Sequence, residues 1–213
     1  MGVKFSKTEY RKIAKSSLNK IVKFRAKSFS YKIHKTLLYI FDKFKSKNIL
    51  LFLPLLYEPN LVILRRRLIK SHNIFLPFMV DKSLKMVKLR LPFNESKFGV
   101  KEANDSNAFF GRIDVAVIPV IGVDGNMARI GHGFGYYDRF FDTLAYKPVV
   151  IFVQIEDFYT KEKICDSHDI KCDFYITPRK NYIKKGNYDR DFYRAHCRGS
   201  RRWSRVFCSQ KDK

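Results

Sequence analysis

Short, continuously apolar runs are the feature that most constrains the fold of this chain. The clearest is IDVAVIPV at residues 113–120, and another, NILLFLP at residues 48–54, closes at a proline. A strand without polar alternation is buried on both faces, which is typical of parallel sheets covered by helices. We expect strands over residues 48–54, 73–78, 84–91, 113–120, 148–154 and 173–177.

Segments with helical periodicity separate these strands. Apolar residues recur with a period near 3.6 across residues 17–47, for example at Ile33, Leu37 and Phe44. Pro59 suits the first turn of a helix through about residue 69, and residues 136–145 predict a third helix. The alternation of helices and buried strands favours an α/β fold, with a mostly parallel sheet flanked by helices on both faces.

The formal net charge of +23 is concentrated at the two ends of the chain. Residues 1–35 carry 11 lysines and arginines against one acid, and residues 179–213 carry 12 against three. We expect one α/β domain over residues 1–182, with a basic N-terminal helix at about 17–47, and a basic, poorly ordered tail over residues 183–213. Basic ends can bind nucleic acid, an anionic membrane or a polyanionic small molecule, or can be a lysine-rich solvated surface.

The sequence predicts a cytoplasmic protein that does not associate with membranes. It has no apolar run of about 18 residues or more, the length that a spanning helix needs. Its cysteines form no C-x-x-C pair and lack histidines at zinc spacing, so reduced thiols are expected. They are Cys165, Cys172, Cys197 and Cys208.

The candidate site is ARIGHGFGYYD, residues 128–138, which follows the strand at 113–120. Glycines at alternate positions allow a tight turn and a close approach to phosphate. Arg129 offers a fixed charge for phosphate oxygens, and the helix expected from Tyr136 points its first amides the same way. Asp138 could hold a cation such as Mg²⁺. The glycine spacing fits neither the dinucleotide fingerprint nor the P-loop.

The longer stretch IPVIGVDGNMARIGHGFGYYD resembles the C-terminal motif of the 5-formyltetrahydrofolate cyclo-ligases. In that family a strand ending in VPG is followed by a turn like FDxxG and then by RLGxGxGYYD. Four other segments resemble family elements in the same order, and the resemblance covers roughly residues 20–180. They are LFLPLLYEPN, FLPFMVDKSLKMVKLRLP, FGVKEANDS and CDSHDIKCDFYITP.

The resemblance implies a ligase of one-carbon metabolism with a ribose-phosphate isomerase/CoA transferase-like three-layer architecture. The family uses ATP and Mg²⁺ to convert 5-formyltetrahydrofolate to 5,10-methenyltetrahydrofolate, with release of ADP and phosphate. The formyl oxygen takes the γ-phosphate, N10 attacks the activated carbon, and phosphate leaves. The folate substrate can carry a polyglutamate tail, and we expect a monomeric enzyme.

Carried over by position, the resemblance assigns roles to particular residues. Tyr137 would orient the formyl group, and Arg129 would act with it in catalysis. The residues implied for ATP are Lys23, Arg25, Arg129, Ile130, Gly131, His132, Gly133, Phe134, Gly135, Tyr136 and Tyr137. Those implied for folate are Leu53, Glu58, Met86, His132, Gly133, Phe134, Gly135 and Tyr136. Asp138 and Asp169 would hold Mg²⁺.

Two positions depart from the family pattern. Phe134 stands where the family often has lysine or glycine, so it cannot neutralise phosphate charge. The family also has an N-terminal Lys/Arg pair that contacts ATP. With Arg25 as its arginine, strict spacing puts Ile21 at the lysine position, so Lys20 or Lys23 would have to take that place.

Structural explanations remain open for several of these residues. Glu58 could cap a helix, His132 could pack within the glycine turn, and Met86 could belong to the core. His168 is more typical of a turn residue. Tyr136 and Tyr137 are adjacent on a helix, so only one of them is expected to face the site.

Two other functions fit parts of the sequence. A nucleic-acid-binding protein would use the basic termini and the aromatic residues among them, but no known nucleic-acid motif is present. A sugar-phosphate isomerase or acyl-CoA transferase relative would share the fold class, but its catalytic motifs are missing. We therefore expect a small-molecule substrate and argue against nucleic acid as the partner.

Overall fold

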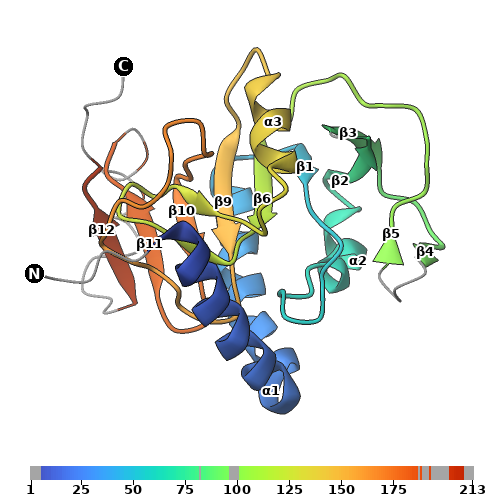
Figure 1. The fold of residues 1–213 in the computed structure, drawn as a ribbon. Coiled ribbons are helices and arrows are strands. Elements are labelled where there is room, and N and C mark those ends of the chain that lie inside the picture. The colour runs from blue at the N-terminus through green and yellow to red at the C-terminus, as the bar shows by residue number, and fades with distance from the viewer. Residues whose placement is uncertain are drawn as a thin grey trace, which may run out of the picture.

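The structure is a computed structural model, which describes residues 6–81, 83–95, 101–186, 188, 192 and 202–208, without the side chains of residues 22–29. An eight-stranded sheet runs through the molecule in the order β12-β11-β10-β9-β6-β1-β2-β3 (Figure 1). Its strands are β1 (Asn48–Leu50), β2 (Asn73–Val80), β3 (Ser83–Lys88), β6 (Val115–Pro119), β9 (Val149–Val153), β10 (Phe174–Ile176), β11 (Asn181–Lys184) and β12 (Trp203–Val206).

The sheet is mostly parallel, as the apolar runs predict. β1 pairs in parallel with β2 and β6, and β9 pairs in parallel with β6 and β10. The antiparallel pairings are β2 with β3 and β10 with β11. Two short hairpins lie outside the sheet: β4 (Asn94–Glu95) with β5 (Lys101–Glu102), and β7 (Gly122–Val123) with β8 (Arg129–Ile130).

Helices cover both faces, which confirms the α/β prediction. They are α1 (Lys7–Lys43), α2 (Arg65–Leu68) after a 3₁₀ turn at Val62–Leu64, and α3 (Tyr136–Asp142). One face of the sheet packs against α1 and α2, through residues such as Leu37 and Leu68. The other face packs against α3 through Phe140. Among the described helices, none has a stretch that is both long and apolar enough to cross a bilayer.

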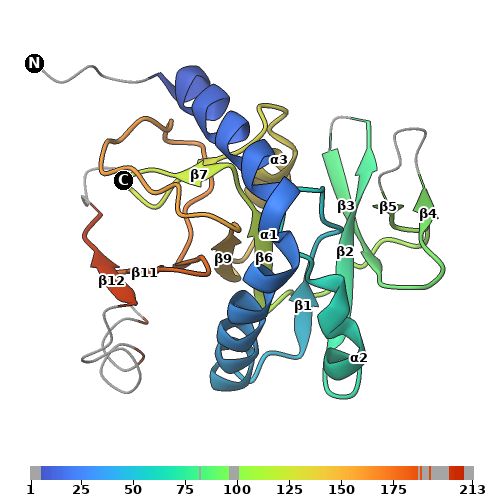
Figure 2. The ribbon, with the colours of Figure 1, turned by 90° about the horizontal axis from the view of Figure 1, so that it is seen from below.

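The first helix begins ten residues earlier than the predicted start at residue 17. Ser6 and Glu9 form a capping box, in which each side chain accepts a hydrogen bond from the other residue's backbone N–H. The N-terminal half of α1 then leaves the face of the sheet, and its Ala14 and Leu18 pack with Ile121 and Ile155 beyond the carboxyl ends of β6 and β9. Figure 2 shows the helix running diagonally across the molecule. This diagonal path brings the start of α1 to the edge where parallel sheets bind ligands.

Two predicted boundaries are wrong. The helix expected over residues 59–69 is reduced to the 3₁₀ turn and α2, a span of 62–68. The tail expected from residue 183 contains a strand, because β12 pairs in parallel with β11 and extends the sheet. Phe192 is also buried, in the same core cluster as Phe174. Apolar periodicity is weak in this region because basic residues separate the few apolar anchors.

The strand order defines where a site can form. From β1 the chain moves outward to β2, whereas from β6 it moves the other way, to β9. Such a reversal opens a crevice at the carboxyl ends of the two central strands, and open α/β sheets bind their ligands there. The segments that follow β1 and β6 therefore meet at this point.

Candidate functional site

Two cavities meet at the carboxyl ends of β1 and β6. The first, the apolar cavity, has a volume of about 480 Å³ and is lined mainly by apolar side chains. The carboxyl group of Glu58 also lines it. The second, the cationic cavity, has a volume of about 310 Å³ and is lined by Lys7, Arg11 and Arg139. Arg129 and Gly135 line both cavities, so the segment that contains them forms the shared wall.

This shared wall is the glycine loop, residues 129–137. His132, Phe134 and Tyr136 line the apolar cavity, whereas Gly131 and Gly133 line the cationic one. Two of the glycines have positive φ, 110° at Gly133 and 66° at Gly135, where other residues would be strained. The alternation that the sequence displays as G-x-G-x-G is thus an alternation between two cavities.

The apolar cavity draws its other walls from distant parts of the chain. Phe52, Leu53 and Leu55 come from the segment after β1. Phe78 and Leu84 come from β2 and β3, which pair antiparallel at one edge of the sheet. A concave, mostly apolar site with a few polar groups suits a flat organic ligand.

Arg129 is the charged centre of the shared wall. Its guanidinium lies 3.4 Å from the Asp138 carboxylate and 3.4 Å from the Pro119 carbonyl oxygen. It also sits 5.0 Å from the centre of the Tyr137 ring, in cation–π geometry. These contacts fix a buried positive charge between the cavities. Burial raises the pKa of Tyr137, which Arg129 only partly opposes, so its hydroxyl keeps its proton.

Glu58 is buried and lines the apolar cavity. One of its carboxylate oxygens accepts a hydrogen bond from the backbone N–H of Leu55 at 2.9 Å. The residue therefore closes a turn and caps no helix, since the 3₁₀ turn begins only at Val62. Burial raises its pKa to about 7, against the opposing effects of the Leu55 bond and of Arg129.

His132 also lines the apolar cavity, from the glycine loop. Its Nε2 lies 2.7 Å from the Tyr57 hydroxyl, and the two rings are stacked. Burial and the nearby charges of Lys15, Arg129 and Arg11 lower its pKa to about 4, so the ring is neutral at physiological pH.

The cationic cavity receives its N-terminal charges from Lys7 and Arg11. Arg11 donates from Nε to the carbonyl oxygen of Gly131 at 2.8 Å, and Lys7 forms a short ion pair with Asp169. Burial alone would lower the pKa of Lys7, but its bond to Asp169 leaves that pKa above the usual value. The ATP contacts predicted for Lys23 and Arg25 fall outside the described side chains.

Sequence reasoning missed Lys7 and Arg11, although a signal was present. The expected Lys/Arg pair requires a spacing of four residues, which Lys7 and Arg11 satisfy without adjustment. The capping box at Ser6 also marks the helix start that turns both side chains to one face.

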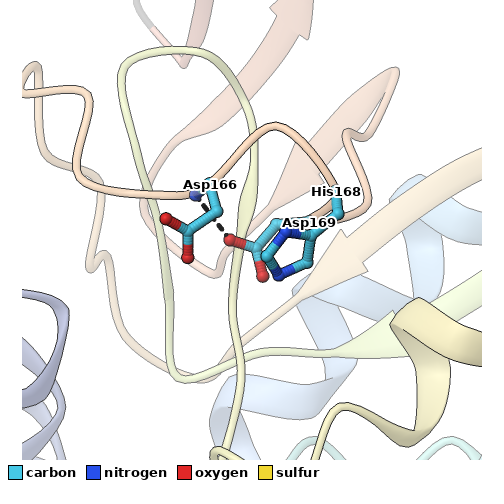
Figure 3. Close-up of side chains that lie close together, drawn as sticks. All are labelled: Asp166, His168 and Asp169. Carbon is cyan, nitrogen blue, oxygen red and sulfur yellow. Dashed lines mark hydrogen bonds between the residues drawn. The ribbon is translucent and has the colours of Figure 1, made fainter.

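The two carboxylates predicted to hold Mg²⁺, Asp138 and Asp169, both line the cationic cavity. Asp138 accepts a hydrogen bond from the N–H of Ile170 at 3.2 Å. Asp169 accepts one from the N–H of Asp166 at 2.7 Å, and Figure 3 shows His168 beside it. Possible ligand atoms of Asp166, His168 and Asp169 lie within 4.8 Å of one another. Carboxylates beside a cationic, phosphate-sized cavity fit a magnesium ion that accompanies phosphates.

Several predicted site residues lie elsewhere or differ in detail. Met86 is in the core, so its predicted place in the folate pocket is wrong; Leu84, on the same face of β3, lines the apolar cavity instead. Ile130 points away from both cavities and packs against α1. Tyr136 and Tyr137 both line the apolar cavity, contrary to the expectation that only one would.

Comparisons with known proteins agree on one family. A sequence model of the 5-formyltetrahydrofolate cyclo-ligase family matches residues 3–178. A 5-formyltetrahydrofolate cyclo-ligase of Mycolicibacterium smegmatis is 33% identical over 73 residues, which cover 34% of this chain and 38% of that relative's length.

Two solved structures share the fold. The 5,10-methenyltetrahydrofolate synthetase of Aquifex aeolicus has a TM-score of 0.70 at 22% identity, covering 85% of this chain and 94% of that one. The 5,10-methenyltetrahydrofolate synthetase of Mycoplasma pneumoniae has a TM-score of 0.60 at 21% identity, covering 81% and 98%. At these identities the two structures support the architecture alone.

Proposed function

This chain belongs to the 5-formyltetrahydrofolate cyclo-ligase family, and on that premise we propose that it converts 5-formyltetrahydrofolate to 5,10-methenyltetrahydrofolate at the expense of ATP. The observation that carries the proposal is the meeting of the two cavities. One is apolar and contains a buried carboxylate, the other is cationic, and the glycine loop separates them. A phosphoryl transfer from nucleotide to folate needs such a junction.

Folate would occupy the apolar cavity. The pterin and aminobenzoyl rings present flat faces that can pack against walls such as Leu53, Phe78 and Tyr136. Glu58 would accept hydrogen bonds from pterin N–H groups, since a carboxylate accepts several donors at once. The pterin would thereby take a fixed orientation, with its formyl group toward Arg129 and Tyr137.

The ATP phosphates would occupy the cationic cavity. Lys7, Arg11 and Arg139 line it, and Arg129 lies in the wall between the two ligands. Asp138 and Asp169 would hold Mg²⁺, which neutralises phosphate charge when bound. Lys7 and Arg11 would take the role that the resemblance gives to an N-terminal Lys/Arg pair.

The chemistry follows from this placement. The formyl oxygen on N5 attacks the γ-phosphorus, the bond to the bridging oxygen breaks, and ADP leaves. N10 then adds to the activated formyl carbon and closes the ring, and loss of phosphate together with the N10 proton gives the methenyl product. The residues act by positioning and charge: Arg129 stabilises the charge on the transferred group, and the protonated Tyr137 hydroxyl orients the formyl oxygen.

The experiment that tests the function is an absorbance assay for 5,10-methenyltetrahydrofolate. The protein is incubated with 5-formyltetrahydrofolate, ATP and Mg²⁺, beside the variant Asp138→Asn. We expect ATP-dependent product from the unaltered protein and a loss of at least about 100-fold in the variant. If the folded protein binds ATP yet forms no product, the proposed reaction is wrong.

We also propose that the substrate carries a polyglutamate tail. Lys101 lines the apolar cavity and is exposed, so it could pair with a tail carboxylate at the mouth. Lys101→Gln should then raise the KM for a pentaglutamyl substrate more than that for the monoglutamate. Equal changes would argue that the tail makes no contact there.

A further inference from the structure

The cavities are linked by a contact that the reaction itself does not require. Tyr57 lies on the segment after β1 (residues 51–61), which also supplies Leu53 and Glu58 to the apolar cavity. Its hydroxyl meets His132 Nε2 at 2.7 Å, and the rings stack with centroids 5.8 Å apart and planes inclined by 29°. One hydrogen bond and one ring stack thus join the segment that holds Glu58 to the glycine loop.

Tyr57 acts from behind the site. It does not line either cavity, and it packs instead against the cluster formed by Ala14, Leu18 and Ile130. His132, in contrast, faces the apolar cavity. Any effect of Tyr57 on a bound ligand must therefore pass through His132 or through the segment on which Tyr57 lies.

Both partners of this bond are neutral. Burial, together with the nearby Glu58, raises the pKa of Tyr57 to about 12, so its hydroxyl keeps its proton. His132 is neutral, since burial and neighbouring cations lower its pKa to about 4. The tautomer of His132 decides which of the two groups donates. In either case the bond and the ring stack together hold the orientation of the imidazole ring.

The segment after β1 is held at a second point, farther along. His34 of α1 lies with Nε2 2.8 Å from the carbonyl oxygen of Asn60. Between the end of β1 and Asn60, the hydrogen bond between Tyr57 and His132 connects the segment to the glycine loop. Glu58 directly follows Tyr57 in the sequence. A shift of this hydrogen bond would move the Glu58 carboxylate relative to Arg129.

We propose that Tyr57 and His132 form a positioning pair that couples the segment after β1 to the glycine loop: the hydrogen bond and the ring stack hold Glu58 and the loop in one arrangement, which sets the affinity of the apolar cavity for folate. The proposal rests on the proposed function for the identity of the ligand. It assigns Tyr57 a role in setting folate affinity without contact to folate.

The first test does not depend on turnover. Amide hydrogen exchange is measured in the unliganded protein, in Tyr57→Phe, and in the control Tyr31→Phe, which alters a tyrosine that is 72% exposed on α1. The amides of Leu55 and Glu58 are hydrogen-bonded within their turn and report its opening. We expect about fivefold faster exchange at this turn and in the glycine loop in Tyr57→Phe, and no change in the control. Faster exchange in only one of the two segments, or in neither, would overturn the coupling.

The second test is kinetic and uses a double-mutant cycle. Tyr57→Phe keeps the ring and loses the hydroxyl, while His132→Phe keeps a ring and loses the Nε2 partner. At saturating ATP, we expect Tyr57→Phe to raise the KM for 5-formyltetrahydrofolate about fivefold with kcat changed less than about twofold. The double variant should be no worse than His132→Phe alone, since both changes remove the same bond.

The outcomes separate this inference from the proposed function. If the unaltered protein makes product and the two substitutions act additively, the positioning pair is wrong and the function stands. If the unaltered protein makes no product, the function fails, and the exchange experiment alone decides whether Tyr57 and His132 tie the two segments together.

Discussion

The two cavities handle charge in opposite ways. In the cationic cavity two of the cations are already paired with carboxylates, Lys7 with Asp169 and Arg129 with Asp138. In the apolar cavity the buried carboxylate, Glu58, accepts a hydrogen bond from a backbone N–H, and burial raises its pKa to about 7. In the cationic cavity, a bound phosphate can therefore replace the carboxylates as the partner of the cations. In the apolar cavity, Glu58 becomes fully charged only when the ligand donates hydrogen bonds to it. Affinity in the first depends on charge, and in the second on hydrogen bonds and shape.

The shared residue Arg129 should give the largest effect, because it serves both cavities. Arg129→Gln removes the charge between nucleotide and folate and leaves Asp138 without its ionic partner. We expect kcat/KM to fall by about 10²–10³-fold and the free energy of unfolding to fall by about 3 kcal/mol. Steady-state kinetics and urea unfolding measure the two losses. The control Arg179→Gln, at a guanidinium that is 69% exposed and 3.8 Å from Glu156, should change neither.

Lys7 should distinguish the cavities, since it lines only the cationic one. Lys7→Met keeps a long side chain and removes the charge. We expect the KM for ATP to rise about 30-fold, in the range of a charged hydrogen bond, while the KM for folate changes little. Lys12→Gln, on the exposed side of the same helix, is the matched control. A comparable rise in both KM values for Lys7→Met would show that the cavities are not separate in function.

The same contrast explains what the sequence could predict. The glycine loop is a contiguous motif, because close approach to phosphate needs glycines such as Gly133, whose φ is 110°. Its residues other than Ile130, and both carboxylates, Asp138 and Asp169, line the two cavities. The sheet was also predictable, since strands buried on both faces leave an unmistakable apolar signature.

The apolar cavity was harder to predict because many apolar residues can fill one wall equally well. Leu53 and Glu58 were found through the resemblance, but Met86 was placed wrongly, and neighbouring Leu84 lines the cavity. Leu84 and Met86 lie on the same face of β3, and only their position along the strand decides which of them reaches the cavity. Apolar periodicity identifies the face but not the position along it. Lys7 was missed for a different reason: the start of α1 is marked by its cap and not by apolar periodicity.

Glu58→Gln should affect only the apolar cavity. The variant keeps the acceptor for Leu55 but loses the charge that pterin donors would meet, so we expect the KM for folate to rise about tenfold with the KM for ATP unchanged. The control is Glu162→Gln, at an exposed residue. A tenfold rise in the KM for ATP, with the KM for folate unchanged, would instead show that Glu58 acts on the nucleotide in the cationic cavity.

The same variant should alter the pH dependence of stability. The pKa of Glu58 rises from 4.5 to about 7 on folding, so the folded protein retains a proton that the unfolded chain releases. The free energy of unfolding should therefore fall as pH rises from 4.5 to 7, by on the order of 3 kcal/mol. In Glu58→Gln this contribution should disappear. Urea unfolding at pH 5 and pH 8 measures it, and an equal decline in both proteins would mean that other groups are responsible.

The smallest effect is expected at Phe134, where a lysine would favour nucleotide binding and an aromatic ring would favour folate binding. Phe134 is 70% exposed, lies between Gly133 and Gly135 of the glycine loop, and lines the apolar cavity. Phe134→Lys restores the residue that the family often has there and adds a charge near the phosphates. Because the site is exposed and screened, we expect the KM for ATP to fall only about threefold. Loss of the ring from the apolar cavity should raise the KM for folate by a similar factor.

The variant Phe134→Leu isolates the effect of losing the aromatic ring on folate binding. It keeps an apolar side chain and adds no charge, so the KM for ATP should stay unchanged while folate binding weakens slightly. If Phe134→Lys lowers the KM for ATP without any cost to folate, the aromatic side chain is dispensable for the apolar cavity. If neither variant changes either KM, position 134 lies outside the boundary between the cavities, and Lys7 with Arg11 already supplies the charge that a lysine provides elsewhere in the family.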